Sequence, residues 1–481
     1  MNKDFVTYKD FGAAGDGITD DFSAIVACHE YANKNGLPVI VSDGEYYLGA
    51  DDMTAVIMTD TDFTGAKFII DDRKVKDITR NCFHIKSDAE YFYPEITSLS
   101  KNQKIIDFPH SGNVYLRVFS DKKVYIRKGL NKNNGTDACD CILVDNVGNV
   151  CCGINWDYEK IKSAYAFSVD DKPVCVRGGI FVTIANEAES AYNYHERNIL
   201  VTRSNVTIEN IVHYVTGEGE HGAPYSGFLC VKDCCNITIK DCTLTPHMTY
   251  YTQSQIPGKM VPMGSYDLNC YGVIGLKLIN IQQTVDICDS TYWGLMGSNF
   301  CKNVSVINCT MSRFDAHCGV TGGEIISCKL GHMGVHLIGF GDFLIENTTV
   351  FNKNFITFRD DFGANFNGNL TIRNCIWKPC SDKGCEYNVF FALNEGDHDF
   401  GYLCSMPENI EIDGLFIDDE NIPEGHNIAV FGTFDDNFSD DKPYPYTVPK
   451  KVILNISCST GKAPEICRKA ELYEGMNVVY K

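Results

Sequence analysis

The sequence predicts an all-β protein in which short parallel strands stack into a long β-solenoid, with one helix at the N-terminal end. A short segment of alternating apolar and polar residues recurs between residues 205 and 458. In the middle of each copy stands a polar residue at which the chain is expected to turn a corner. The corners Asn308, Ser327 and Asn347 lie 19 and 20 residues apart. A repeat of that length with strands and no helix is typical of a solenoid whose coils hydrogen-bond to one another.

The N-terminal helix is predicted between an acidic start and a glycine stop. Asp20 or Asp21 is placed to N-cap it, and Asn35-Gly36 ends it. One face of this helix is apolar and contains Ala24, Ile25, Cys28 and either Tyr31 or Ala32. Such a helix covers the open end of the solenoid, which otherwise exposes unpaired backbone groups.

The corners of the repeat are Asn, Asp or Ser, the residues that favour tight turns. Each joins two half-buried strands, and we assign the corners to Asn210, Asp241, Asn280, Asn308, Ser327, Asn347, Asn374, Asp413 and Asn455. The shortest coils fall between 308 and 347, whereas the coils before 280 and after 374 carry extra residues. A short central section between long loops predicts a groove with walls.

A column of small and apolar residues follows the corners and is predicted to stack inside the solenoid. Its members are Cys242, Ile281, Cys309, Cys328, Thr348, Cys375 and Gly414. The chain has 23 cysteines, an odd number in a large chain, and we interpret them as free thiols used for packing. Cys139, Cys141, Cys151 and Cys152 lack the C-x-x-C spacing of a metal site.

Residues 8–49, YKDFGAAGDGITDDFSAIVACHEYANKNGLPVIVSDGEYYLG, resemble the opening of the pectate-lyase-like right-handed parallel β-helix superfamily. That superfamily includes polygalacturonase relatives and many phage tailspikes. The resemblance implies a right-handed parallel β-helix with an N-terminal capping helix. We expect the cap and first coil within residues 1–50. Residues 51–481 then continue a single β-helix with loop insertions and an acidic C-terminal section.

The charge of the chain argues against nucleic-acid and membrane partners. Its net charge of −21 repels nucleic acid and anionic lipid. No run of about 18 apolar residues predicts a membrane span, and the first residues lack the pattern of a signal peptide. We therefore expect a cytoplasmic protein, or a virion protein if a phage encodes it.

Candidate site residues lie in the central coils, on the outward face of the strands. This row combines carboxylates, imidazoles, guanidinium groups and aromatic rings within about four coils. Its members are Asp267, Tyr292, Trp293, Arg313, Asp315, His317, His332, His336, Arg359, Asp360 and Asp361. His317 and His336 each lie nine residues past their corner, so we expect them to be neighbours in adjacent coils.

A glycoside hydrolase is the leading hypothesis, with a carbohydrate as substrate. Asp315 paired with Asp360 or Asp361 supplies two carboxyl groups, with His317 or His336 tuning Asp315. Strands two coils apart are separated by about 10 Å, which fits an inverting arrangement. Arg359 and Arg313 are expected to bind substrate or lower a neighbouring pKa. Tyr292 and Trp293 stack on sugar rings, and Asp267 and His332 complete the substrate-binding set.

Two alternatives remain open. A polysaccharide lyase would use His317 or His336 as the base and Arg313 or Arg359 to neutralise a uronate. A non-catalytic tailspike or adhesin would only bind glycans.

Other features of the sequence bear on walls, cofactors and assembly. Glu218, Glu220 and His221 lie in a glycine-rich loop and are candidates for a groove wall. No metalloenzyme motif is present and no cofactor is expected. Calcium remains open, because residues 395–441 contain 14 acidic residues and no Lys or Arg. Association into a homotrimer also remains open.

Overall fold

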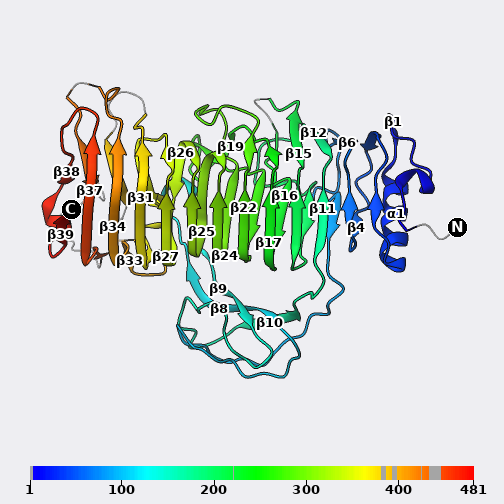
Figure 1. The fold of residues 1–481 in the computed structure, drawn as a ribbon, viewed down its shortest axis with the longest axis horizontal. Coiled ribbons are helices and arrows are strands. Elements are labelled where there is room, and N and C mark those ends of the chain that lie inside the picture. Colours follow the sequence, from blue (N-terminus) through cyan, green and yellow to red (C-terminus); the bar gives the residue numbers. More distant parts are fainter. Residues whose placement is uncertain (1–3, 220–221, 381–385, 393–397, 424, 433–445) are drawn as a thin grey trace.

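The computed structural model describes residues 4–219, 222–380, 386–392, 398–423, 425–432 and 446–481. These residues form a right-handed parallel β-helix that runs from the helix α1 (Phe22–Asn35) at one end to the last strands at the other (Figure 1). The predicted fold class is therefore confirmed. Within the described residues no helix has both the length and the apolar character needed to cross a membrane.

Thirty-two of the described strands belong to one continuous parallel sheet that winds around the solenoid. Their bounds are β1 (Asp16–Asp20), β2 (Val39–Ile40), β3 (Gly44–Leu48), β4 (Ala55–Ile57), β5 (Thr61–Asp62), β6 (Ala66–Asp71), β7 (Phe83–Ile85), β11 (Val174–Arg177), β12 (Ile180–Ile184), β13 (Ile199–Val201), β14 (Val206–Glu209), β15 (Val212–Thr216), β16 (Leu229–Lys232), β17 (Cys235–Lys240), β18 (Thr243–Leu244), β21 (Leu268–Tyr271), β22 (Ile274–Ile279), β23 (Gln282–Gln283), β24 (Met296–Ile307), β25 (Thr310–Ile326), β26 (Lys329–His336), β27 (Gly339–Glu346), β28 (Thr349–Val350), β29 (Asn354–Phe358), β30 (Phe366–Asn367), β31 (Asn369–Trp377), β32 (Tyr387–Ala392), β34 (Asn409–Ile417), β35 (Ile428–Phe431), β37 (Lys451–Cys458), β38 (Glu465–Cys467) and β39 (Asn477–Tyr480).

The remaining described elements are short or lie outside the solenoid. They are the strands β8 (Val114–Val124), β9 (Thr136–Val144), β10 (Ser163–Ser168), β19 (Tyr250–Gln253), β20 (Met260–Met263), β33 (Cys404–Ser405) and β36 (Tyr446–Thr447), and the 3₁₀ turns Tyr8–Phe11, Gly129–Asn131, Asp360–Phe362 and Ala470–Tyr473.

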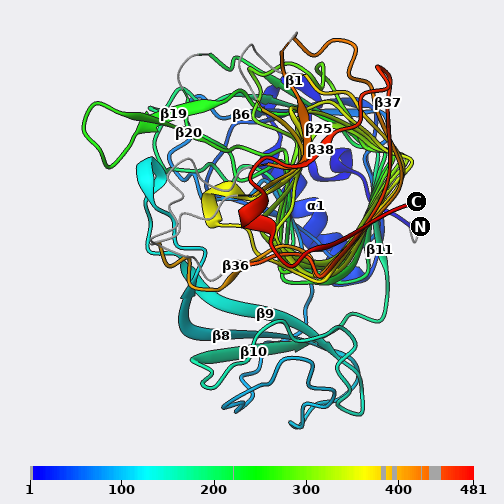
Figure 2. The same cartoon turned by 90° about the vertical axis from the view of Figure 1, so that its left-hand side faces the viewer.

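Helix α1 covers the N-terminal end of the β-helix, as Figure 2 shows in the view along the solenoid axis. Asp20 accepts a hydrogen bond from the Phe22 amide at 3.1 Å, and Gly36 ends the helix with a φ of 64°. Asp21 precedes the helix, but its carboxylate accepts the amides of Ala14 and Gly15 instead of capping it. The buried face includes Ala32 and not Tyr31, which is 48% exposed.

The corners of the repeat adopt the left-handed backbone conformation. Seven of the nine predicted corner residues have a φ between 50° and 58°: Asn210, Asp241, Asn280, Asn308, Ser327, Asn347 and Asn374. Their side chains also bond from coil to coil, since Asn280 Nδ2 donates to Asp241 Oδ1 at 2.8 Å. Asn and Asp tolerate this conformation because their short polar side chains form such bonds.

The corner predicted at Asp413 is wrong by one residue. Strand pairing aligns Arg373 with Asp413 and Cys375 with Leu415, so the left-handed corner is Gly414, with a φ of 90°. Leu415 therefore takes the column position that we assigned to Gly414.

The column that follows the corners is buried, as predicted. Cys242, Ile281, Cys309, Cys328, Thr348 and Cys375 are each at most 2% exposed. Every cysteine that the structure describes is a free thiol. The cysteines of this column are small enough to stack at the spacing of successive coils.

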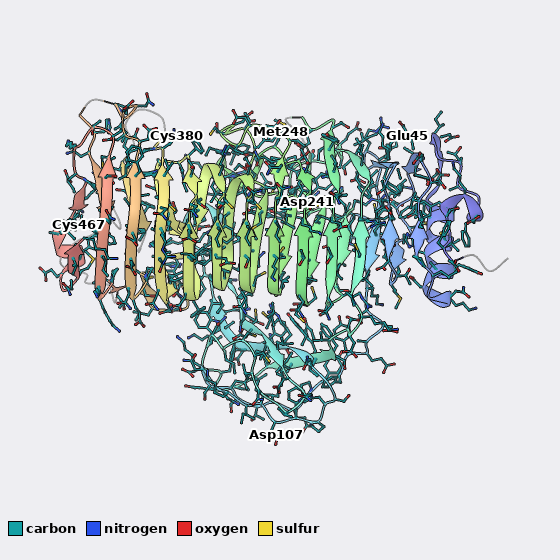
Figure 3. The ribbon with its side chains drawn as sticks, viewed as in Figure 1. Glu45, Asp107, Asp241, Met248, Cys380 and Cys467 are labelled. Atoms are coloured by element: carbon teal, nitrogen blue, oxygen red, sulfur yellow. The ribbon has the colours of Figure 1, made fainter. Side chains whose placement is uncertain are left out.

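A lobe inserted between β7 and β11 projects from the side of the solenoid, and contains an antiparallel sheet in the order β10-β8-β9. Asp107 lies at its outer end (Figure 3). The buried ion pair between Asp140 of the lobe and Lys302 of β24, at 2.6 Å, attaches it to the solenoid. This insertion explains why the repeat pattern is weak between residues 50 and 200.

Substitutions at Asn280 test the role of the corner bonds. Asn280→Ala removes the hydrogen bond to Asp241. It also leaves in the left-handed region a residue whose side chain forms no polar bond to offset the strain of that conformation. We therefore expect a loss of about 2 kcal/mol in the free energy of unfolding. Asn280→Gly removes the same bond without backbone strain and should cost less. Urea unfolding of both variants measures the difference. Equal destabilisation by Ala and Gly would contradict this account of the corners.

Candidate functional site

A cavity of about 590 Å³ lies against the central coils of the β-helix. Its walls come from the lobe, through Arg127 and Asn131, and from the strand β20 and the segment after it, through Pro262, Met263 and Gly264. Two kinds of side chain dominate the lining. They are the aromatic residues Tyr192, Tyr194, Tyr225, Tyr266, Tyr271 and Trp293, and the titratable residues Arg127, Arg313, His317, His336, Arg359 and Asp361.

The strand register brings Asp315 and His336 side by side. Asp315 of β25 pairs with Gly297 of β24 on one side and with His336 of β26 on the other. His336 pairs in turn with Thr357 of β29. One face of three adjacent coils thus places these side chains in a row, because equal register positions stack about 4.8 Å apart.

The predicted pairing of His317 with His336 is wrong. The pairing of β25 with β26 shifts by two residues between Met311↔Leu330 and Arg313↔Gly334. His336 therefore moves beside Asp315. His317 lies in a second shift of register, between the pairs Gly297↔Asp315 and Asn299↔Cys318, where β25 has one more residue than β24. Both histidines still line the cavity.

His317 is held in one tautomer by its two neighbours. Its Nδ1–H donates to Asn299 Oδ1 at 2.9 Å, and its Nε2 accepts from Arg127 Nη2 at 3.3 Å. Burial, together with the charge of Arg359, lowers the pKa of His317 to about 3. Burial and the charge of Arg313 lower the pKa of His336 to about 3 as well. Both imidazoles are neutral at physiological pH.

Two aspartates share one arginine, Arg359. Arg359 Nη1 donates to both oxygens of Asp315, at 2.7 and 2.9 Å, and its Nη2 donates to Asp361 at 2.7 Å. Arg313 pairs with Asp315 at 2.7 Å, and Arg127 pairs with Asp361 at 2.6 Å. Three arginines therefore converge on two carboxylates.

These arginines keep both carboxylates ionised. Burial alone would raise the pKa of Asp315, but Arg313 and Arg359 hold it far below its usual range. In the same way Arg359 and Arg127 outweigh the effect of burial and lower the pKa of Asp361 to about 2. Tyr266 donates its hydroxyl to Asp315 and adds to this stabilisation.

Several buried polar atoms around the cavity have no hydrogen-bond partner among the described residues. They are Nε and Nη1 of Arg313, Nε of Arg127, Nε of Arg359, Nε1 of Trp293, Nδ1 of His336 and Oδ1 of Asp361. Leaving a buried donor unpaired costs about 1–3 kcal/mol, so native proteins keep few of them. Most of these atoms are donors, which indicates a ligand rich in acceptor oxygens.

Six of the predicted site residues line the cavity: Trp293, Arg313, His317, His336, Arg359 and Asp361. Asp315 is fully buried beneath it, so its predicted contact with substrate is replaced by contacts with arginines. The side chain of Asp360 lies outside what the structure describes. Tyr292 and His332 do not line the cavity, and His332 hydrogen-bonds to the carbonyl of Ile287 at 3.0 Å.

Asp267 lies below the aromatic wall and not in the cavity. Its carboxylate accepts from His213 at 2.9 Å and from the amide of Thr245 at 2.9 Å, and its side chain is fully buried. No part of this side chain is exposed, and its oxygens are occupied by His213 and Thr245.

Glu218 supports the same wall from the other side. It accepts hydrogen bonds from His247 at 2.7 Å and from the amide of Met248 at 3.1 Å; Met248 is labelled in Figure 3, on the edge of the solenoid away from the lobe. His247 stacks on Tyr225, whose ring lines the cavity. Burial alone would lower the pKa of His247, but Glu218 and Asp267 raise it to about 10. Glu220 and His221 lie outside the described residues.

Sequence analysis missed Arg127 and the tyrosines. Arg127 belongs to the lobe, where the coil repeat gives no register, and its guanidinium lies 4.2 Å from the ring centre of Phe362. Tyr266 directly precedes Asp267, which is followed by β21, so a tyrosine beside a predicted site residue was the one available signal.

The described residues contain no group of three or more His, Cys, Asp or Glu side chains placed to hold a metal ion. The acidic stretch 395–441, on which the calcium prediction depends, is only partly described. Calcium therefore stays a prediction.

Comparison with known proteins identifies the fold. No protein-family model matches the chain, and no curated protein matches it. Among solved structures, the tailspike gp49 of Pseudomonas phage LKA1 is 14% identical with a TM-score of 0.54, covering 98% of this chain and 84% of that one. The Gp54 tailspike of Acinetobacter baumannii bacteriophage AP22 is 12% identical with a TM-score of 0.51, covering 99% and 77%. The predicted resemblance to pectate-lyase-like β-helix proteins is confirmed at the level of the fold.

The neutral histidines predict acid sensitivity. Their pKa of about 3 in the folded protein lies below the 6.5 of an unperturbed imidazole, so the unfolded chain binds more protons between these values. The free energy of unfolding should fall as the pH decreases below 6.5. His336→Gln removes one such group and should flatten the slope by up to about 1.4 kcal/mol per pH unit. Urea unfolding at several pH values measures it. Identical slopes for both proteins would refute a neutral His336.

Proposed function

We propose that the protein is a carbohydrate-active β-helix that binds an acidic polysaccharide in the 590 Å³ cavity and cleaves it by β-elimination. One observation carries this proposal: arginine donors without partners lie beside neutral imidazoles in an aromatic cavity. The sequence left two alternatives to a glycoside hydrolase, and this proposal corresponds to the first of them, a polysaccharide lyase.

The aromatic lining supports a sugar as the ligand. Trp293 and the tyrosines offer flat apolar faces next to hydroxyl and amide groups, a combination that suits a pyranose ring. The fold neighbour from phage AP22 was solved in complex with an A. baumannii capsular saccharide. The saccharide in that complex belongs to the phage AP22 protein, and it makes a glycan the first ligand class to test on the present protein.

The arginines support an acidic sugar. Arg313 has two unpartnered nitrogens, Nε and Nη1, each of which can donate a hydrogen bond to an oxygen of an acidic sugar. Arg127 and Arg359 each add a further unpartnered Nε. The local charge of the cavity is therefore opposite in sign to the net charge of −21 of the whole chain. Cavity walls of low dielectric make the local charges dominate there.

Hydrolysis by paired carboxylates is less compatible with this geometry. That reaction needs one carboxyl group protonated at working pH, so that it can protonate the leaving oxygen. Arg313, Arg359 and Arg127 lower the pKa of both aspartates, and Asp315 does not reach the cavity. The two carboxylates serve better as anchors that orient the arginines.

Elimination uses the groups that the cavity offers. An arginine bound to the uronate carboxylate offsets its charge and makes the C5 proton more acidic. His336, neutral and with a free Nδ1, accepts that proton, the C4–O bond breaks, and the leaving oxygen takes a proton from solvent or a tyrosine hydroxyl. The bound carboxylate also raises the pKa of His336 and so strengthens it as a base.

Substitutions at Arg313 test the proposal. Arg313→Gln should reduce turnover of an acidic polysaccharide by about 10²-fold or more, because it removes the group that neutralises the uronate. Arg313→Lys keeps the charge but loses the separate guanidinium donors, so its turnover should lie between those of the unmodified protein and of Arg313→Gln. The assay follows reducing ends together with the ultraviolet absorbance of unsaturated uronates, across a panel of acidic and neutral glycans.

The matched control is Arg373→Gln, which removes an arginine that pairs with Glu346 on the outer surface and is 45% exposed. It should leave activity unchanged. New reducing ends without the absorbance would indicate hydrolysis, and binding without any product would indicate a glycan-binding protein. Either outcome would overturn elimination.

A further inference from the structure

A second cavity, of about 340 Å³, lies on the seam between the lobe and the C-terminal half of the solenoid. Its lining combines Trp156 and Tyr158 of the lobe with Phe340, Asn367 and Tyr402 of the later coils. We propose that this cavity is a second saccharide site, which binds a neutral pyranose ring. It goes beyond the proposed function, because it needs neither cleavage nor an acidic sugar in the first cavity.

Aromatic rings on one side of the cavity are held in fixed positions. Trp156 packs edge to face on Phe340, with ring centres 4.8 Å apart and planes at 81°. Tyr402 lies 6.2 Å from Trp156, and its hydroxyl donates to the carbonyl of Phe362 at 2.8 Å. Trp156 is only half-buried although its neighbours fix it. A fixed, partly open indole is the surface on which the apolar face of a sugar ring stacks.

Amides and hydroxyls line another side. Asn367 Nδ2 donates to Asn365 Oδ1 at 2.7 Å, and Ser405 Oγ donates to Asn367 Oδ1 at 3.3 Å. From the lobe, Asn155 Nδ2 donates to Thr321 Oγ1 at 2.8 Å. These bonds orient groups that both donate and accept, which suits the hydroxyls of a sugar.

Tyr158 provides an independent sign of a missing partner. Its side chain lines the cavity and is 2% exposed, and its hydroxyl has no hydrogen-bond partner among the described residues. A buried phenol normally finds such a partner. A ligand hydroxyl would supply it.

The charges favour a neutral ligand over an acidic one. No arginine is found among the described residues that line this cavity, in contrast to the three in the first. Lys450 pairs with Glu408 at 3.2 Å, and Lys101 lies over the ring of Phe340, 5.4 Å from its centre. Asp157 adds a negative charge to the lining. Lys122 also lines the cavity, and all three lysines are exposed, so among the described residues none is a buried cation with unpartnered nitrogens like Arg313 in the first cavity.

A single aromatic wall separates the two cavities. Tyr125 lies between Phe362 and Tyr402, at ring-centre distances of 5.3 and 5.5 Å. Phe362 lies in turn beneath Arg127 and Arg359 of the first cavity, and Tyr402 lines the second. The second site is therefore a neighbour of the first but has its own lining.

The tryptophans of this chain allow a direct test. The chain has three: Trp293 in the first cavity, Trp156 in the second and Trp377 fully buried in the core. In Trp293→Phe, Trp156 is the only cavity indole that a soluble quencher reaches. The methyl glycosides of glucose, galactose, mannose and N-acetylglucosamine are the probes. We expect at least one of them to protect the fluorescence of Trp293→Phe from acrylamide in a saturable manner.

Two further variants in the Trp293→Phe background locate the effect. Trp156→Phe should abolish the protection, and Asn367→Ala should weaken the affinity by about tenfold through loss of one or two hydrogen bonds. Thermal unfolding checks that both remain folded, and Asn367→Ala keeps the reporter if Trp156→Phe does not fold. Arg313→Gln should not change the protection, so failure of the elimination proposal and failure of this one are distinguishable.

Three outcomes would overturn the second site. One is no protection by any glycoside of the panel. Another is protection that Asn367→Ala leaves unchanged. The third is stronger protection by inorganic phosphate than by any sugar, which would assign the cavity to an anion, with Lys101, Lys122 and Lys450 as its ligands.

Discussion

Backbone hydrogen bonds between successive coils determine the rest of this structure. They fix the distance between equal positions at about 4.8 Å, so that each position in the coil becomes a column of stacked side chains. Inside, the column must be small and apolar, which Cys309 and Cys328 satisfy. At the corners, the backbone must turn in the left-handed region, which Asn and Asp tolerate. On the outside, polar residues that are far apart in sequence come together, one from each coil. The row that they form lines the first cavity.

The regular part of this arrangement can be predicted from the sequence. The corner residues, the buried column and the capping helix follow from local preferences that repeat, so one sequence suffices to identify them. Arg313, His317, His336 and Arg359 were recognised for the same reason, because they follow the corners on the outward face. Prediction failed where the register changed. The two extra residues on β26 place His336 beside Asp315, and counting from the corner cannot detect such a shift.

The other errors have a different physical cause. Whether an outward residue is exposed depends on what covers the face, and the cover here comes from long insertions whose paths the repeat does not encode. Asp267 and Asp315 point away from the interior of the solenoid but are fully buried by neighbouring loops and side chains. Burial then requires partners, so Asp315 lies between Arg313 and Arg359, and Asp267 lies beside His213. Carboxylates that looked like reacting groups in the sequence act as counter-ions in the structure.

The lobe enters the solenoid without interrupting it. Strand β11 pairs with β5, β12 with β6 and β13 with β7, so the coil after the insertion continues on the coil before it (Figure 1). An insertion of this kind behaves as a cassette, because the gene segment that encodes it could be replaced by another while the coils on either side keep their pairing. The same cassette carries Arg127 to the first cavity and Trp156 to the second. Exchange of this one segment would then alter the linings of both cavities together, in a single genetic step.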